Sequence, residues 1–121
     1  EDYDLWLRFL RHTPIGYIKK ETVTKYGGHT DQLSTKYTAM DHFRVFSLIE
    51  QYNKETNTTF KQKLTIIINK KTGILKQGAE KRHNTNAIGL YNQILDHLNS
   101  HTLIPKHIYE TLLTHVQNNK N

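Results

Sequence analysis

Two short stretches near the amino terminus hold the residues whose types and spacing could do chemistry. The first is Glu1-Asp2-Tyr3-Asp4, an acidic group that leads directly into the apolar run around Trp6. Carboxylates at the start of a helix face the positive end of its dipole and can accept hydrogen bonds from its free N–H groups. A helix of this kind would hold a carboxylate in a fixed position, as a general base requires. On this stretch alone, a simple acidic helix cap is the favoured interpretation.

The second stretch is Gly27-Gly28-His29-Thr30-Asp31-Gln32-Leu33-Ser34, about twenty residues further on. Two consecutive glycines allow a tight turn and a close approach of the backbone to a ligand. His29 and Asp31 are two residues apart just after this turn, where both could face a diphosphate or a divalent metal. The alternative is a surface turn in which Asp31 or Ser34 caps the next helix.

The two stretches together, with Pro14-Ile15-Gly16-Tyr17-Ile18 between them, resemble the carboxyl-terminal part of the family 2 inverting glycosyltransferases. These enzymes have the GT-A fold and transfer a sugar from a nucleotide donor. Residues 74–84 also resemble the tail helix of one branch of the family. The resemblance touches most of the chain and is densest over residues 1–46.

The resemblance implies a role for each matching residue. Asp2 would be the catalytic base for the acceptor hydroxyl, with Glu1 beside it in the Glu-Asp motif, and Trp6 would pack behind the acceptor site. His29 would help to hold the metal–diphosphate end of the donor, in a loop that includes Gly27, Gly28 and Asp31. The intact enzyme would use a nucleotide sugar, an acceptor and a divalent metal, Mg or Mn, and we expect no metal tightly bound to this chain.

The chain also departs from the family pattern. In the family, a nucleotide-binding half with its Asp-x-Asp metal motif precedes the Glu-Asp motif, and that half is not among these 121 residues. We therefore expect a fragment that is inactive alone, from a bacterial glycosyltransferase that is cytoplasmic or peripheral to a membrane. We also expect self-association, because the first two helices carry apolar surface that the family buries. The alternative is a stand-alone basic helical module that binds a protein, a membrane surface or nucleic acid.

The charge divides the chain into an acceptor-side segment, residues 1–55, and a basic helical tail, residues 56–121. The first segment holds eight acidic and eight basic side chains, whereas the tail holds nine Lys or Arg and three Asp or Glu, which gives the net charge of +6. The tail could approach anionic lipid or nucleic acid. Because its basic residues are spread along the sequence, a solvated helix surface is favoured, and nucleic acid is the disfavoured partner.

Cysteine and histidine usage limits the metal chemistry. The chain has no Cys, which excludes disulfides and thiolate sites. Of the eight His, His97 and His101 are four residues apart, as a helical metal pair could be. Solvated positions on helix surfaces are nevertheless the favoured interpretation for every His except His29.

The pattern of apolar stripes and breaks predicts a mainly α fold with one or two short strands, as the carboxyl-terminal part of a GT-A fold would have. Helices are expected near residues 2–11, 35–53, 58–82, 86–99 and 104–117, and strands within 15–26. One stretch is ambiguous, because Thr65-Ile66-Ile67-Ile68 could begin a β-hairpin over 65–76. The longer helical stripe through residues 60–82 favours a helix there.

Overall fold

The computed structural model describes residues 2–28 and 39–118 of the chain. Within these residues it contains five helices: α1 (Asp2–Leu10), α3 (Asp41–Lys54), α4 (Thr58–Lys81), α5 (Thr85–Asn99) and α6 (Lys106–Asn118). The prediction of a mainly α fold is confirmed, and the bounds of α1, α4, α5 and α6 agree with the expected ranges to within two residues. The second helix was expected over 35–53, but α3 begins at Asp41, because residues 39 and 40 form a turn in which Ala39 has φ 60°; residues 35–38 lie outside the described residues.

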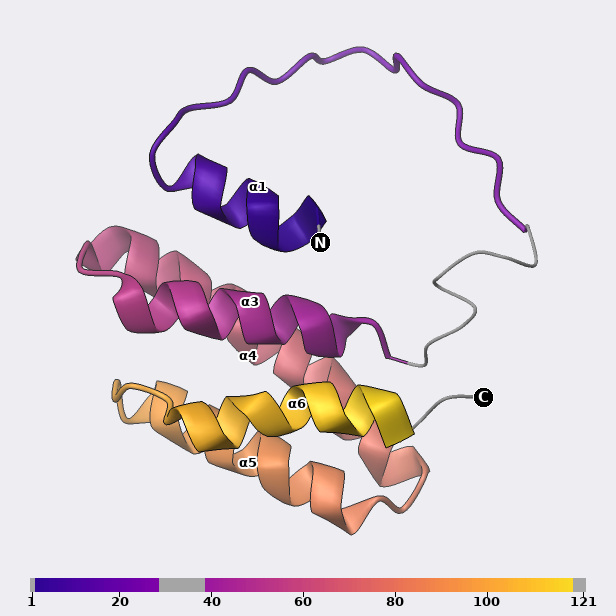
Figure 1. The fold of residues 1–121 in the computed structure, drawn as a ribbon, viewed down its shortest axis with the longest axis vertical. Coiled ribbons are helices and arrows are strands. Elements are labelled where there is room, and N and C mark those ends of the chain that lie inside the picture. The colour runs from indigo at the N-terminus through magenta and orange to yellow at the C-terminus, as the bar shows by residue number, and fades with distance from the viewer. Residues whose placement is uncertain (1, 29–38, 119–121) are drawn as a thin grey trace.

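The predicted strands within residues 15–26 are wrong, since the described chain forms no strand there. Residues 11–13 instead form a turn after α1, residues 14–28 run on as an extended segment away from it, and all of residues 11–28 are exposed (Figure 1). β-Branched and aromatic side chains favour a strand only where a neighbouring strand can pair with it. No such neighbour is present in the described part of the chain, so the local preference leaves this segment without regular structure.

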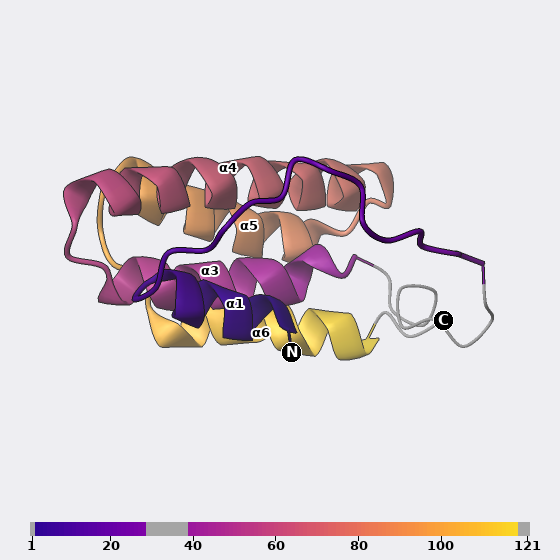
Figure 2. The ribbon, with the colours of Figure 1, turned by 90° about the horizontal axis from the view of Figure 1, so that it is seen from above.

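Helices α3 to α6 form a four-helix bundle in which each helix runs antiparallel to the next (Figures 1 and 2). Contacts join α3 to α4, α4 to α5, α5 to α6 and α6 back to α3, which closes the ring. Helix α1 lies outside this ring, along α3. The connections explain the topology. Because they are short, each helix must turn back and pack antiparallel to the helix before it.

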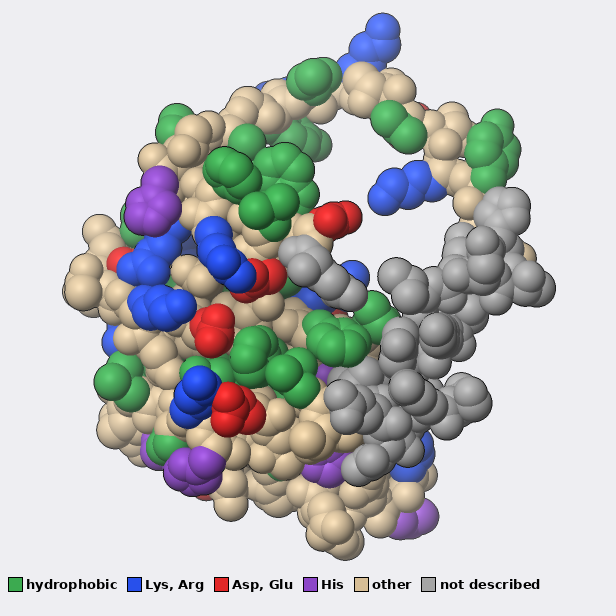
Figure 3. Space-filling view, in the orientation of Figure 1, with side chains coloured by type: hydrophobic (Ala, Val, Ile, Leu, Met, Phe, Trp, Pro, Cys, Tyr) green, Lys and Arg blue, Asp and Glu red, His purple; other side chains and the backbone are tan. Residues whose placement is uncertain are grey.

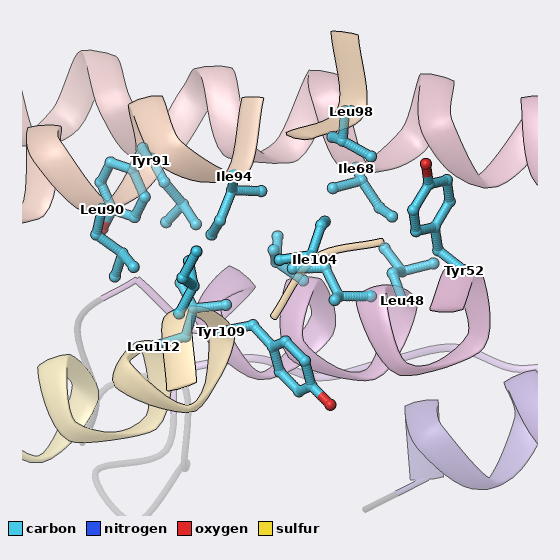
Figure 4. Close-up of a cluster of buried hydrophobic side chains, with 14 of the residues drawn as sticks. Leu48, Tyr52, Ile68, Leu90, Tyr91, Ile94, Leu98, Ile104, Tyr109 and Leu112 are labelled. Carbon is cyan, nitrogen blue, oxygen red and sulfur yellow. The ribbon is translucent and has the colours of Figure 1, made fainter. Parts of the chain in front are cut away.

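The core fills the centre of the bundle with side chains from all four helices (Figure 4). Its largest fully buried apolar members are Leu48, Ile49, Tyr52, Ile68, Tyr91, Ile94, Leu98, Ile104 and Leu112. On α3 the buried positions recur at helical spacing through Val45, Leu48, Ile49 and Tyr52. This stripe is what fixes the face of α3 that turns away from α1.

The ambiguous stretch around Ile66 is helical, and the hairpin alternative is wrong. Asn57 caps α4, and its side-chain oxygen accepts a hydrogen bond from the Phe60 N–H at 3.1 Å. Ile68, Thr72, Leu75 and Ala79 are buried on one side of the helix. Tertiary packing of this stripe outweighs the β preference of a four-residue run.

Helices α4 and α5 end in the same way, each with a histidine in the left-handed region. His83 has φ 54° and His101 has φ 55°. After α4, the Asn84 N–H donates to Ala79 O at 3.0 Å and the His83 N–H donates to Glu80 O at 3.1 Å. This is the Schellman arrangement, which usually places glycine where the two histidines stand.

The end of α5 removes His97 and His101 as a helical metal pair. The helix stops at Asn99, so His101 lies past its end and the four-residue spacing does not place both rings on one helix face. The His97 Nδ1 atom is instead 2.8 Å from the Thr102 Oγ1 atom.

No helix within the described ranges is long and apolar enough to cross a membrane.

The link between α5 and α6 is tied to α3 by two side chains, since the Tyr52 hydroxyl donates to Thr102 O at 3.2 Å and Asn53 bonds to Ile104. The Asn53 amide donates to Ile104 O at 2.8 Å, and the Asn53 side-chain oxygen accepts from the Ile104 N–H at 3.0 Å. Ile104 was expected at the start of the last helix stripe, but it precedes α6 and is buried in the link. Its backbone groups are satisfied by Asn53 in place of a helix.

Candidate functional site

Helix α1 presents its two carboxylates differently. Asp2 and Asp4 both lie in the first turn, where negative charge suits the helix dipole. Asp4 forms an ion pair with Arg8 one turn later, whereas the Asp2 side chain is exposed. Tyr3 and Leu7 pack against the core of the bundle, and this contact orients the helix. Asp2 is therefore held at the start of an anchored helix with its carboxylate accessible.

A hollow of about 800 Å³ lies beside Asp2, between α1, α3 and α6. Two surfaces line it, one from α1 and one from α3, with a single contribution from α6. The lining residues are Asp2, Tyr3, Asp4, Trp6, Arg8, Met40, Phe43, Arg44, Phe46, Ser47, Glu50 and Leu113. Aromatic side chains, carboxylates and guanidinium groups thus face one space, which is the mixture that binding sites for polar organic ligands use.

The charge beside this hollow is held in place by a small network on α3. The Arg44 guanidinium donates to the Asp41 carboxylate at 2.9 Å and lies 5.8 Å from the centre of the Tyr3 ring. Lys71 of α4 also reaches Asp41, at 2.9 Å. Burial alone would raise the pKa of Asp41, but the hydrogen bonds from Lys71 and Arg44 outweigh it and lower the pKa. Asp41 therefore stays ionised and holds Arg44 at the edge of the hollow.

Trp6 lies in the same lining as Asp2. Its side chain is 54% exposed and meets Phe9 with a ring separation of 6.2 Å. Leu5, Phe9 and Leu10 are also about half exposed, and the space-filling view shows hydrophobic side chains over α1 and along the extended segment (Figure 3). Helix α1 thus exposes an apolar surface on its outer side, and only Tyr3 and Leu7 pack against the core of the bundle.

The structure does not bring the glycine turn to Asp2. Gly28 has φ 97°, in the region that favours glycine, as the turn was expected to require. Gly27 and Gly28 are exposed at the end of the extended segment, and this end lies away from α1 in both ribbon views (Figures 1 and 2). Glu1, His29 and Asp31 lie outside the described residues.

The described residues do not supply a metal centre. Across residues 2–28 and 39–118, no group of three or more His, Asp or Glu side chains is placed to hold an ion. Asp2 and Asp4 are neighbours, but the Asp4 carboxylate is taken by Arg8. A divalent metal would need ligands from other residues, so the proton transfer proposed for Asp2 does not depend on a metal ion.

One expectation about the histidines is wrong, because His42 is not solvated. It is 1% exposed, and its Nε2 atom lies 2.5 Å from the Tyr91 hydroxyl. Burial, followed by the positive charge of His115, lowers its pKa to about 4. A sequence signal existed, since His42 stands three residues before Val45 and seven before Ile49, on the buried stripe of α3.

The α3 wall of the hollow was also missed by sequence reasoning. The sequence predicted a helix near 35–53 with apolar surface, but it gave no link between Phe43 or Phe46 and Asp2. No protein-family model, curated protein sequence or solved structure matches the chain.

Proposed function

We propose that this chain supplies the acceptor side of an inverting, nucleotide-sugar-dependent glycosyltransferase, with Asp2 as the catalytic base. One observation supports this most directly. The accessible Asp2 carboxylate and the Trp6 ring, both named by the resemblance, lie in the lining of a single hollow of about 800 Å³. Aromatic and charged side chains from α3 complete that hollow, and such a lining suits an acceptor that presents hydroxyl groups.

The chemistry asked of Asp2 is a single proton transfer. The acceptor hydroxyl oxygen attacks the anomeric carbon of the donor, its proton passes to the Asp2 carboxylate, and the nucleoside diphosphate leaves from the opposite face. Because the bond to the acceptor forms as the bond to the diphosphate breaks, the configuration at the anomeric carbon inverts. The base must be fixed on the acceptor side, and packing of Tyr3 and Leu7 against the bundle fixes α1.

The donor would be bound by a nucleotide-binding half that these 121 residues do not include. The exposed segment 11–28 and the apolar outer side of α1 offer surface for that half to cover. In this proposal His29, outside the described residues, meets the diphosphate or its Mg or Mn ion. A protein of this kind would act in the cytoplasm on a nucleotide sugar and an acceptor.

The test compares two Asp→Asn variants in a protein that joins this chain to a donor-binding half. Asp2→Asn should lower kcat by about 10²–10⁴, the range for a positioned base, with KM for the donor little changed. Asp4→Asn is the matched control, since it makes the same chemical change two residues away, at a carboxylate paired with Arg8. It should retain most of the turnover.

The readout is release of nucleoside diphosphate from a panel of nucleotide hexoses, followed with and without candidate acceptors. Unchanged turnover in Asp2→Asn would remove the base assignment and return Asp2 to the role of a helix cap. Turnover of a nucleotide sugar by the 121-residue chain alone would contradict the expectation that this segment needs a separate donor-binding half.

The second candidate is a basic helical interaction module, in which the acidic group is only a cap. The observation that favours it is the concentration of positive charge on α4, which the glycosyltransferase proposal does not use. That charge does not depend on the role of Asp2.

A further inference from the structure

Helix α4 has a second apolar stripe, on the side that faces away from the bundle. Phe60, Ile66, Ile67 and Ile74 are 41–67% exposed, and Lys63, Lys70 and Lys81 are exposed among them. These seven residues are called the outer face of α4. At 3.6 residues per turn they fall within an arc of about 120°, opposite the buried stripe of Ile68, Thr72 and Leu75. Figure 2 shows α4 along one edge of the bundle, and the exposure of these seven side chains marks the side of the helix that does not pack into it.

The net charge of the chain is concentrated on this helix. Residues 58–82 contain seven Lys or Arg and one acidic residue, Glu80, a net of +6. The rest of the chain holds the remaining ten basic and ten acidic side chains, a net of zero. Glu80 lies outside the outer face and is 4.0 Å from Lys76. The tail is therefore less evenly basic than its sequence spacing indicated.

Apart from Lys76, which lies near Glu80, the lysines of α4 divide into two groups. Lys71 reaches Asp41 at 2.9 Å, and the Lys61 ammonium lies 4.7 Å from the centre of the Tyr52 ring, so these two are used inside the fold. Lys63, Lys70 and Lys81 meet no carboxylate within the described residues, and Lys63 is 5.5 Å from the Phe60 ring centre. The charges on the outer face are thus available to an external anion.

The apolar surface continues past α4. A hollow of about 460 Å³ joins Phe60 and Ile67 to Leu7 and Leu10 at the end of α1. Leu10 is itself 46% exposed. Large apolar side chains therefore extend from α4 through this hollow to the end of α1.

We propose that the outer face of α4 rests on an anionic lipid bilayer. The three lysines would lie at the level of the lipid phosphates, and the four apolar side chains would enter the boundary between headgroups and acyl chains. A helix that combines large apolar residues with lysine and lacks acidic residues on one face is typical of this mode of binding. The proposal is independent of the glycosyltransferase assignment.

The apolar half of the face is what selects lipid over nucleic acid. Lys and Arg supply most of the free energy of binding to a nucleic-acid phosphate backbone. Ile66, Ile67 and Ile74 would add little to that free energy, because bulky apolar side chains do not contribute to a solvated ionic contact. An anionic bilayer interacts with both kinds of side chain. The lysines are attracted to its negatively charged headgroups, and the isoleucines become buried away from water.

The first test uses the full chain and vesicles of phosphatidylcholine with or without phosphatidylserine, in a sedimentation assay. The chain should bind the anionic vesicles and bind the neutral ones much more weakly. Lys63→Gln, Lys70→Gln and Lys81→Gln together should weaken binding about a hundredfold, since each basic residue near an anionic surface contributes roughly fivefold.

A matched control removes the same charge elsewhere. Lys19→Gln, Lys20→Gln and Lys25→Gln change three exposed lysines of the extended segment, which also lie among large apolar residues. This variant has the same net charge as the α4 variant and should bind anionic vesicles as the unchanged chain does. Equal losses in the two variants would show that only net charge matters and would overturn the assignment to α4.

The apolar residues are tested in the same way. Ile67→Asn with Ile74→Asn should weaken vesicle binding by about tenfold or more, whereas Ile15→Asn with Ile18→Asn should leave it unchanged. All four positions are more than one-third exposed, and unchanged circular dichroism would show that the bundle remains folded. No binding to anionic vesicles, or tight binding to duplex DNA or RNA that the isoleucine changes do not affect, would overturn the proposal.

Discussion

His42 should make the bundle sensitive to mild acid. Its ring is buried between α3, α5 and α6, where it stacks with Tyr91 at 5.9 Å and with His115 at 6.5 Å. The Nδ1 atom makes no hydrogen bond of ordinary geometry within the described residues. Protonation of His42 would place a charge in this apolar setting, next to His115. The folded state therefore favours the neutral ring, and protonation of His42 destabilises the fold.

The groups around His42 act in both directions on its pKa. Burial lowers the pKa most, His115 and Arg82 lower it further, and the Ala39 carbonyl and the Asp41 carboxylate raise it; the result is about 4 in place of the ordinary 6.5. The folded state therefore binds fewer protons than the unfolded state between these two values. Stability is fully present above about pH 6.5 and is lost as the pH falls toward 4.

The expected magnitude follows from these two pKa values. Between pH 7 and pH 5, the difference in proton binding amounts to roughly 2 kcal/mol of unfolding free energy. This window lies above the ordinary pKa values of Asp and Glu, so the carboxylates contribute little to the change. A loss of this size is a large share of the stability of a domain of this length.

The assay is urea unfolding at pH 7 and pH 5, followed by far-ultraviolet circular dichroism. His42→Leu with Tyr91→Phe removes the titrating group together with the hydroxyl that would otherwise be left unpaired, and its stability should change little between the two pH values. His107→Gln, at an exposed position on α6, is the control and should keep the full pH dependence. Equal stability of the unchanged chain at both pH values would refute this reasoning. So would a double variant that loses as much unfolding free energy between pH 7 and pH 5 as the unchanged chain loses.

Three further predictions concern the backbone. Gly73 lies inside α4 with nothing within 4 Å of an added Cβ, so Gly73→Ala should raise the unfolding free energy by about 0.5–1 kcal/mol in the same urea assay. Gly78→Ala should gain less, because its Cβ would meet the Arg82 guanidinium at 3.3 Å; an equal gain at both sites would show that this contact is without cost. His83→Gly should also stabilise the chain, by roughly 1 kcal/mol, because φ 54° is strained for histidine and not for glycine. A loss of stability in His83→Gly would mean that the histidine side chain contributes more than the strain costs.

Much of the helical architecture is determined by the sequence alone. The stripe through Val45, Ile49 and Tyr52, the caps at Asn57 and Asn84, and the break before Pro105 each act within a few residues of chain. Local signals of this kind place helices without knowledge of their neighbours. The long stripe of α4 was sufficient to choose a helix over a hairpin for the same reason.

Other features depended on which surfaces meet. The strand preference of residues 15–26 was real but had no partner strand among the described residues, and His42 became a core residue because α5 and α6 close over it. The hollow beside Asp2 exists because α3 brings Phe43, Phe46 and Arg44 to α1 from forty residues away in the sequence. The outer face of α4 could be identified only once its opposite side was known to be buried. Sequence patterns report the preferences of one segment, whereas burial and juxtaposition are properties of pairs of segments, and only the tertiary structure determines those pairs.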